Sequence, residues 1–285
     1  MKHVRADVLE VSAANAARDG SVLSALAALF VLTLRQHLRG RRLIVLSVLF
    51  LLPSVLVVIV KLTAEPPPSF SSHLEFVFTL ILIPSMLATL TALLYAAGIV
   101  RDEIEEQTLT YLMLRPLPRW ALYVTKLAAT TLVTSVMTGT FTMLAMLVIH
   151  LDSPDQWRDA LLDRGLKTVA LLAIAQVGYC ALFGVIGLLT RHALIVGILY
   201  VIVFEGLLAN FDTVARRLTL MYYFRVLVIR WFDPPEARAW SIDLTTAPSA
   251  GDCTLTILGA SLVFTLVGAW LTWRGEFRMK TPEGS

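Results

Sequence analysis

Long uninterrupted stretches of apolar residues dominate the sequence and set its expected architecture. Six of them are suited to crossing a membrane, because a helix needs about 20 mostly apolar residues to span a hydrocarbon core of about 30 Å. The two-residue alternation of a transmembrane barrel is absent from the sequence. Since hydrocarbon offers no partner for backbone groups, these segments must be helical. The pattern predicts an all-α membrane protein with six transmembrane helices, over residues 43–60, 74–99, 120–149, 168–189, 193–208 and 255–273.

A shorter apolar run, residues 22–34, precedes the six and continues into the basic string RQHLRGRR. Its 13 residues fit an interfacial or buried helix better than a span. We expect an amphipathic elbow helix over 22–38, capped by Ser21, with Arg39, Arg41 and Arg42 anchoring it to anionic lipid. A cleaved signal peptide is disfavoured because the basic block follows the apolar core and no A-x-A-like site occurs. A frayed hydrophobic tail is the alternative.

Composition and charge support a membrane protein and orient it. Hydrophobic residues make up 57% and charged residues 16% of the chain, against about 45–50% and about 25% in soluble domains. With the N-terminus in the cytoplasm, 15 of the 24 Lys and Arg residues fall on the cytoplasmic side, which is the expected bias. The predicted organisation is a cytoplasmic N-terminus with the elbow helix (1–40), a six-helix transmembrane domain (41–274) and a cytoplasmic tail (275–285).

Motifs for catalysis or cofactor binding are absent from the sequence. It contains no G-x-x-x-x-G-K-[ST] phosphate loop, so we expect no ATP binding of that kind by this chain. It also has no H-E-x-x-H, G-x-S-x-G or Cys-x-x-Cys motif. Cys180 and Cys253 are expected to be small buried or interfacial residues rather than a disulfide framework. We expect no metal, no cofactor and no nucleic acid partner.

One charged segment, RDEIEEQTLTYLMLRPLPRW at 101–120, interrupts the apolar pattern between the second and third spans. Its acids have the wrong sign for the C-terminal end of span two but suit the N-terminus of a new helix. We predict a short helix over 108–114, with Thr108 as its cap and Arg115 near its end. Pro116 ends that helix, and Pro118 falls in the first turn of span three.

The string GIVRDEIEEQTLTYLMLRPLPRWALYVTKL resembles the first cytoplasmic loop of ABC-2 type transporter permeases. Gln107 departs from the usual glycine of that pattern, and Thr125 precedes the lysine in place of another glycine. The six-span layout, the basic elbow helix and the long outer loop resemble the same family over most of the chain. The matching residues of the loop are Ile99, Glu103, Glu105, Thr108, Leu109, Leu112, Pro116, Arg119 and Lys126.

The resemblance implies a permease subunit of an ABC exporter in the bacterial cytoplasmic (inner) membrane, with both termini cytoplasmic. Two permease copies, identical or closely paralogous, would pair among membrane lipids. Separate ABC ATPase subunits, which bind ATP and Mg, would dock on loop 101–119 through its coupling helix. The implied coupling residues are Glu103, Glu105, Thr108, Leu109, Leu112, Arg115, Pro116 and Arg119, with Arg119 and Lys126 also anchoring span three. The alternative for the acids is a solvated loop.

Polar residues inside spans are costly and tend to face a bundle interior or a cavity. Glu205 is the acid within span five, and the hypotheses for it are a pathway residue, a group hydrated at the outer headgroups, or a partner of an Arg in the following loop. Pro84 predicts a kink in span two. Resemblance to the family places spans two and five at the central cavity, so the pathway candidates are Thr89, Tyr95, Tyr200 and Glu205.

The outer loop, residues 211–252, contains LTLMYYFRVLVIRWF, which is too short and too charged to span. It predicts a re-entrant or interfacial helix at the outer headgroups, with Tyr222, Tyr223 and Trp231 at that level. Such a helix would serve as a gate or as a membrane-surface anchor. The following segment, 233–252, is expected to be an ordered loop without recognisable chemistry.

Three other classes of protein are considered as alternatives. A secondary transporter would use several intramembrane acids or broken helices in repeated halves, and we expect only Glu205 and no repeat. An intramembrane enzyme is disfavoured because His150 and His192 have no partners at useful spacing, so each is expected to contact headgroups. A non-transporting scaffold that recruits a cytoplasmic protein through the same loop is the third reading. For the transporter reading, a cavity lined by Tyr, Thr and aliphatic side chains favours an amphipathic or lipid-like cargo over a small ion.

Overall fold

The computed structural model describes residues 22–64, 70–99, 118–151, 160–211 and 214–274, and every regular element in these ranges is helical. The predicted all-α class is confirmed. The first element that the structure describes is the helix Val22–Arg39. The elements that follow are α2 (Arg41–Ala64), α3 (Phe70–Glu75), η1 (Phe76–Ala88), α4 (Thr89–Ala96), α7 (Arg119–Ile149), η2 (Ala160–Gly165), α9 (Leu166–Leu189), α10 (Ala193–Tyr200), η3 (Val201–Leu207), η4 (Leu208–Asn210), η5 (Val214–Leu218), α11 (Leu220–Phe232), η6 (Pro235–Trp240) and α12 (Ala250–Arg274).

Seven helices in the described ranges are long and apolar enough to cross a membrane, one more than the predicted six. The additional one is Val22–Arg39, which is 18 residues long and has the lowest mean hydropathy of the seven. Its helical conformation agrees with the expectation for 22–38, while its position as an elbow on the membrane surface stays a prediction. The other six are Arg41–Thr63, Phe70–Ala96, Arg119–Ile149, Leu161–Leu189, Ala193–Asn210 and Ala250–Arg274.

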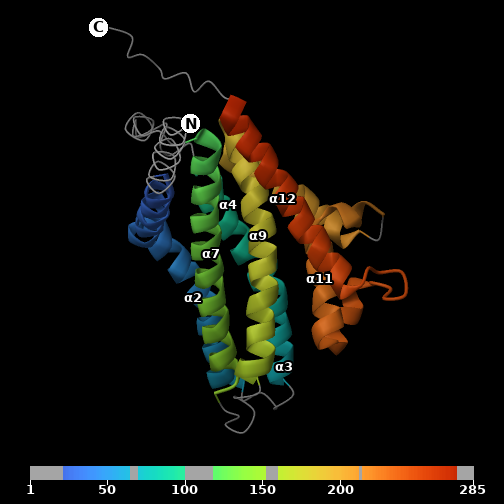
Figure 1. Ribbon diagram of the computed structural model, residues 1–285. Helices are drawn as coiled ribbons and strands as arrows, with labels where there is room; N and C mark the ends of the chain where they lie inside the picture. The colour runs from blue at the N-terminus through green and yellow to red at the C-terminus, as the bar shows by residue number, and fades with distance from the viewer. Residues whose placement is uncertain (1–21, 65–69, 100–117, 152–159, 212–213, 275–285) are drawn as a thin grey trace, which may run out of the picture.

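The bundle is organised around α7 and α9, which run side by side along its length (Figure 1). Helix α2 packs on α7 at one side, and α12 crosses α9 at the other before meeting α11. Helix α9 also contacts α4, so it touches most of the long elements. We call the two ends of the bundle the Arg119 end, where α7 begins, and the His150 end, where α7 finishes.

Span two contains a long π-helical segment around Pro84, the position of the predicted kink. The segment η1 includes Pro84, which has no amide hydrogen to donate to a helical ladder. The shift to i→i+5 hydrogen bonding around such a residue is a known way for a helix to absorb a break. The Thr89 hydroxyl donates to the Pro84 carbonyl oxygen at 3.0 Å, which satisfies an acceptor there.

Helices α9 and α4 approach so closely that one position admits only glycine. A Cβ atom built on Gly187 would lie 2.4 Å from the carbonyl oxygen of Ala97. Because that oxygen belongs to the backbone, no side-chain rotation can relieve the clash. Small residues at helix interfaces commonly allow such approaches in membrane proteins.

The variant Gly187→Ala is therefore expected to lower the free energy of unfolding by about 1–3 kcal/mol, the usual cost of overpacking. Gly259→Ala in α12 is the matched control, since a Cβ there meets nothing within 4 Å. Denaturant unfolding of both purified variants in mixed micelles measures the difference. Equal stabilities for the two variants would contradict the close packing of α9 on α4.

Candidate functional site

The predicted coupling residues from Glu103 to Pro116 lie outside the described residues, since the structure describes nothing from 100 to 117. The last part of the loop is described. Pro118 is the N-cap of α7, close to its predicted place in the first turn, and Arg119 is the first helical residue and is exposed. The docking roles of the loop residues remain predictions.

Two cationic side chains donate hydrogen bonds to backbone carbonyl groups at the end of span two. The Nζ of Lys126 donates to the carbonyl oxygen of Ile99 at 3.3 Å, and the side chain is only 4% exposed. Nη1 of Arg42 donates to the carbonyl oxygen of Leu94, also at 3.3 Å. Positive charge is favourable at a helix C-terminus, where carbonyl groups lack intrahelical partners. The end of span two is thus tied to α2 and α7.

The helix Val22–Arg39 packs on the same region through a few residues on one face. Leu29 and Thr33 are buried, and Nε2 of His37 lies 2.9 Å from the Thr130 hydroxyl of α7. The His37 ring also meets the edge of Tyr95, with centroids 4.9 Å apart. Most of the remaining surface of this helix is exposed.

The four pathway candidates occupy the packed interior of the described chain. Thr89 and Tyr95 are buried on α4; the Thr89 hydroxyl bonds within its own span, and the Tyr95 ring contacts His37 beside a polar cavity at the Arg119 end. Tyr200, which is partly buried, donates its hydroxyl hydrogen to Oε1 of Glu205 at 3.0 Å. A role in the substrate pathway remains a prediction for all four.

Glu205 caps the outer-loop helix α11. Its carboxylate accepts hydrogen bonds from the backbone N–H groups of Leu220 (3.2 Å) and Met221 (2.9 Å), the first two residues of α11. The side chain is 4% exposed, so the structure does not place it among hydrated headgroups. Arg225 lies near Glu205, but its guanidinium donates to the carbonyl oxygen of Ala209 and to the side chain of Asn210. A carboxylate suits this place because helix N-termini carry partial positive charge.

Replacing Glu205 with Ala is expected to lower the free energy of unfolding by about 3 kcal/mol, because each buried donor without a partner costs about 1–3 kcal/mol. Tyr200→Phe, which removes a single hydrogen bond to the same carboxylate, is expected to cost about 1 kcal/mol. Denaturant unfolding compares them, and limited proteolysis between residues 211 and 220 reports detachment of α11. If Glu205→Ala costs no more than Tyr200→Phe, the capping role is wrong.

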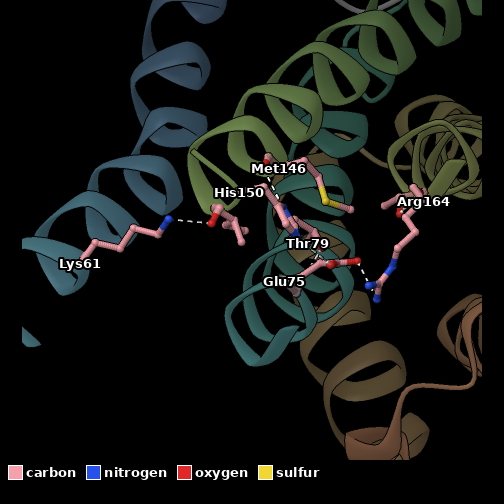
Figure 2. A network of polar contacts seen from close by, with 8 residues as sticks. Lys61, Glu75, Thr79, Met146, His150 and Arg164 are labelled. Atoms are coloured by element: carbon pink, nitrogen blue, oxygen red, sulfur yellow. Dashed lines mark hydrogen bonds and ion pairs between the residues drawn. The ribbon is translucent and has the colours of Figure 1, made fainter. Parts of the chain in front are cut away.

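A second polar network joins four elements at the His150 end (Figure 2). Glu75, at the end of α3, is 1% exposed and forms an ion pair with Nη2 of Arg164 at 3.1 Å. Its other oxygen lies 3.7 Å from Nε2 of His150. Nδ1 of His150 lies 3.0 Å from the Met146 carbonyl oxygen, which can only accept, so Nδ1 carries a hydrogen. On α2, Lys61 donates to the carbonyl oxygen of Ile149 at 2.7 Å.

This network corrects two sequence-based expectations. His150 was expected to contact headgroups without a partner, but it is buried and faces Glu75. Glu205 was expected to be the one intramembrane acid, yet Glu75 is a second, inside the predicted span 74–99. Glu75 and His150 are 75 residues apart in the sequence, so their spacing did not indicate the contact. A signal for the contact was present in the sequence. An acid, a histidine and an arginine occur at those ends of spans two, three and four that lie on the same side of the membrane.

The outer loop folds back onto the His150 half of span two. The predicted helix exists as α11, and Tyr222 is buried in the core, while its level in the membrane stays a prediction. The ring of Trp240 in η6 packs on Phe76 with centroids 5.2 Å apart, and Glu236 lies 3.9 Å from His73. Nε of Arg230 donates to the Pro248 carbonyl oxygen at 2.8 Å. The segment predicted as a loop contains the short helix η6 and the start of α12 at Ala250.

An exposed acid stabilises a turn within this loop. The backbone N–H and then the hydroxyl of Thr245 donate to Asp243, at 2.9 and 2.8 Å, and they lower the pKa of that carboxyl below its usual value. Hydrogen bonds to the charged form have this effect. Asp243 therefore belongs to the loop's own turn structure.

The described residues contain no group of three or more His, Cys, Asp or Glu side chains placed to hold a metal ion. Cys180 and Cys253 are both buried and unbridged, as expected for small core residues. The chemistry of the described bundle is that of charge pairs, helix caps and apolar packing.

The sequence model of the ABC-2 family transporter proteins matches residues 27–271. The chain belongs to this family. The match covers nearly all of the described bundle, which runs from residue 22 to 274, and includes loop 101–119, so the resemblance noted in that loop extends over the membrane domain. Comparison with curated proteins finds no match. As an ABC-2 family permease, the chain is an integral membrane component of an ABC transporter, a type of component that lacks an ATP-binding motif of its own.

Proposed function

We propose that this ABC-2 permease is the membrane subunit of an ATP-driven exporter for an amphipathic or lipid-like substrate. It works as a dimer in the bacterial cytoplasmic membrane, with both termini in the cytoplasm. Separate ATPase subunits dock on loop 101–119 and supply the ATP and Mg sites. The observation that carries the proposal is the family match over residues 27–271 in a sequence without a phosphate loop.

The contacts at the Arg119 end support coupling through this loop. The loop begins after Ile99, whose carbonyl oxygen is held by Lys126, and it ends at Pro118, the N-cap of α7. Helices α4 and α7 both pack on α9, in the centre of the bundle. A displacement of the loop by a docked ATPase would therefore act on two central helices at once.

The exposed apolar surface of span five supports a subunit interface there. Elements α10 and η3 present large apolar side chains outward, while Ala193, Gly197 and Glu205 are buried. Such an apolar surface is covered either by lipid or by a second permease subunit. The resemblance to the family places span five beside the central cavity of the dimer, which favours the second copy. The exposed residues are Leu194, Ile195, Val196, Ile198, Leu199, Ile202, Phe204 and Leu207.

The proposal is tested by purifying the tagged full-length chain from its native membranes in mild detergent and identifying what is retained. We expect an ATPase subunit with a phosphate loop in stoichiometric amount, and a crosslinked permease dimer. Mass spectrometry of small molecules in the same preparation identifies the cargo. Recovery of a different cytoplasmic protein would indicate a scaffold, and transport driven by an ion gradient without ATP would indicate a secondary transporter.

A further inference from the structure

A polar cavity of about 480 Å³ opens at the Arg119 end, between the helix Val22–Arg39, the start of α2, the end of α4 and the first turns of α7. Its lining contains four cationic side chains, Arg39, Arg41, Arg42 and Lys126, and no acid among the described residues. The described lining therefore contributes four cationic groups and no acidic one.

The cavity is built into the fold rather than laid on its surface. Lys126 and Thr130 are both buried, although both line it. His37 and Gln36 add polar groups from the N-terminal helix, and His37 is positioned by its contacts with Thr130 and Tyr95. Arg39 and Arg41 flank Gly40, where the first helix ends, and both are exposed at the cavity's edge. Buried donors thus lie below, and exposed guanidinium groups lie at the mouth.

The positions of two cationic residues on α2 indicate the level of this cavity in the membrane. Arg42 and Lys61 lie 19 residues apart on that helix, a rise of about 29 Å at 1.5 Å per residue. A bilayer hydrocarbon core is about 30 Å thick. Lys61 lies at the His150 end, so placing it at one headgroup plane puts Arg42 and the cavity at the other. A ligand there would share the level of lipid phosphates.

We infer that this cavity binds the phosphate group of an anionic phospholipid headgroup. Phosphate oxygens accept several charge-assisted hydrogen bonds, and the guanidinium fork of arginine matches their geometry. Basic pockets between transmembrane helices bind anionic lipid headgroups in this way. The bound headgroup would hold the helix Val22–Arg39 against α4 and α7. Tyr95, one of the predicted pathway residues, also lines this cavity, but the inference does not depend on the chain being an exporter.

The inference is tested by native mass spectrometry of the delipidated full-length chain, titrated with cardiolipin, phosphatidylglycerol or phosphatidylcholine. Arg39→Gln and Arg41→Gln are each expected to weaken binding of the two anionic lipids about fivefold. Arg35→Gln is the matched control, because Arg35 is exposed on the same helix but does not line the cavity. It should change the affinity less than twofold.

Three outcomes overturn the inference: equal affinity for phosphatidylcholine and phosphatidylglycerol, equal weakening by Arg35→Gln and Arg41→Gln, or no retention of anionic lipid.

A competition with inorganic phosphate distinguishes the sources of the ligand. Displacement at millimolar phosphate supports phosphate recognition shared with a soluble ion, and its failure supports the lipid headgroup. Photocrosslinking of a headgroup-labelled phosphatidylglycerol to the unsubstituted protein adds a second readout. Labelling should fall on peptides 36–42 and 126–130, and labelling elsewhere contradicts the site.

Discussion

The variant Arg164→Gln is expected to lower the free energy of unfolding by about 3 kcal/mol, the lower end of the cost of breaking a buried ion pair. Its partner Glu75 is 1% exposed and would lose the cation that lies 3.1 Å away. The lower end applies because the Arg164 side chain is itself 40% exposed and partly hydrated. Unfolding of the purified chain in mixed micelles measures the effect.

A nearby exposed pair provides the control for this prediction. Lys167 lies 2.7 Å from Asp163, four residues earlier on the same stretch of helix, and both side chains are exposed. Lys167→Gln is expected to cost less than about 0.5 kcal/mol, since exposed pairs contribute little. The double variant Glu75→Gln with Arg164→Gln should recover part of the loss, because the uncompensated charge is gone. Equal costs for Arg164→Gln and Lys167→Gln would contradict the buried network.

The variant Glu103→Lys is expected to reduce recovery of the ATPase subunit with the purified permease by at least about tenfold, while the permease remains folded. Reversing a charge within an interface that recognises an acid costs several kcal/mol, and each 1.4 kcal/mol is tenfold in affinity. Quantitative mass spectrometry of the affinity-purified complex measures the recovery, and size-exclusion chromatography of the permease alone checks its fold.

Glu106→Lys is the matched control, because it makes the same charge reversal in the same loop at a position outside the family pattern. It should leave more than half of the ATPase bound. If both variants lose the ATPase equally, the loop acts only through its total charge. If neither does, the loop is solvated and docking occurs elsewhere.

The spans were predictable from the sequence because their signal is local. The run 120–149 predicts α7, observed at Arg119–Ile149, and the run 193–208 predicts the span observed at Ala193–Asn210. Length and apolarity alone decide such segments. The helix Val22–Arg39 shows where this signal becomes ambiguous, since its 18 residues meet the length for a span while its charged C-terminal turn suits an interface.

The polar contacts were less predictable because they depend on how the helices pack. Glu75, His150 and Arg164 come from three different segments, and their contact requires the ends of those segments to be brought to one level. Glu205 was recognised as unusual in span five, but its hydrogen bonds to the start of α11 follow from the fold of a loop without spanning periodicity. A sequence pattern identifies a charged residue inside an apolar span more easily than it identifies the hydrogen-bond or ion-pair partner of that residue.

The most direct test of the proposed function is ATP hydrolysis by the copurified complex after reconstitution into liposomes. Hydrolysis should depend on the permease, increase with the cargo identified in the preparation, and fall to the level of the isolated ATPase with Glu103→Lys. An ATPase rate that is the same with the wild-type permease, with the Glu103→Lys variant and with no permease would contradict the account.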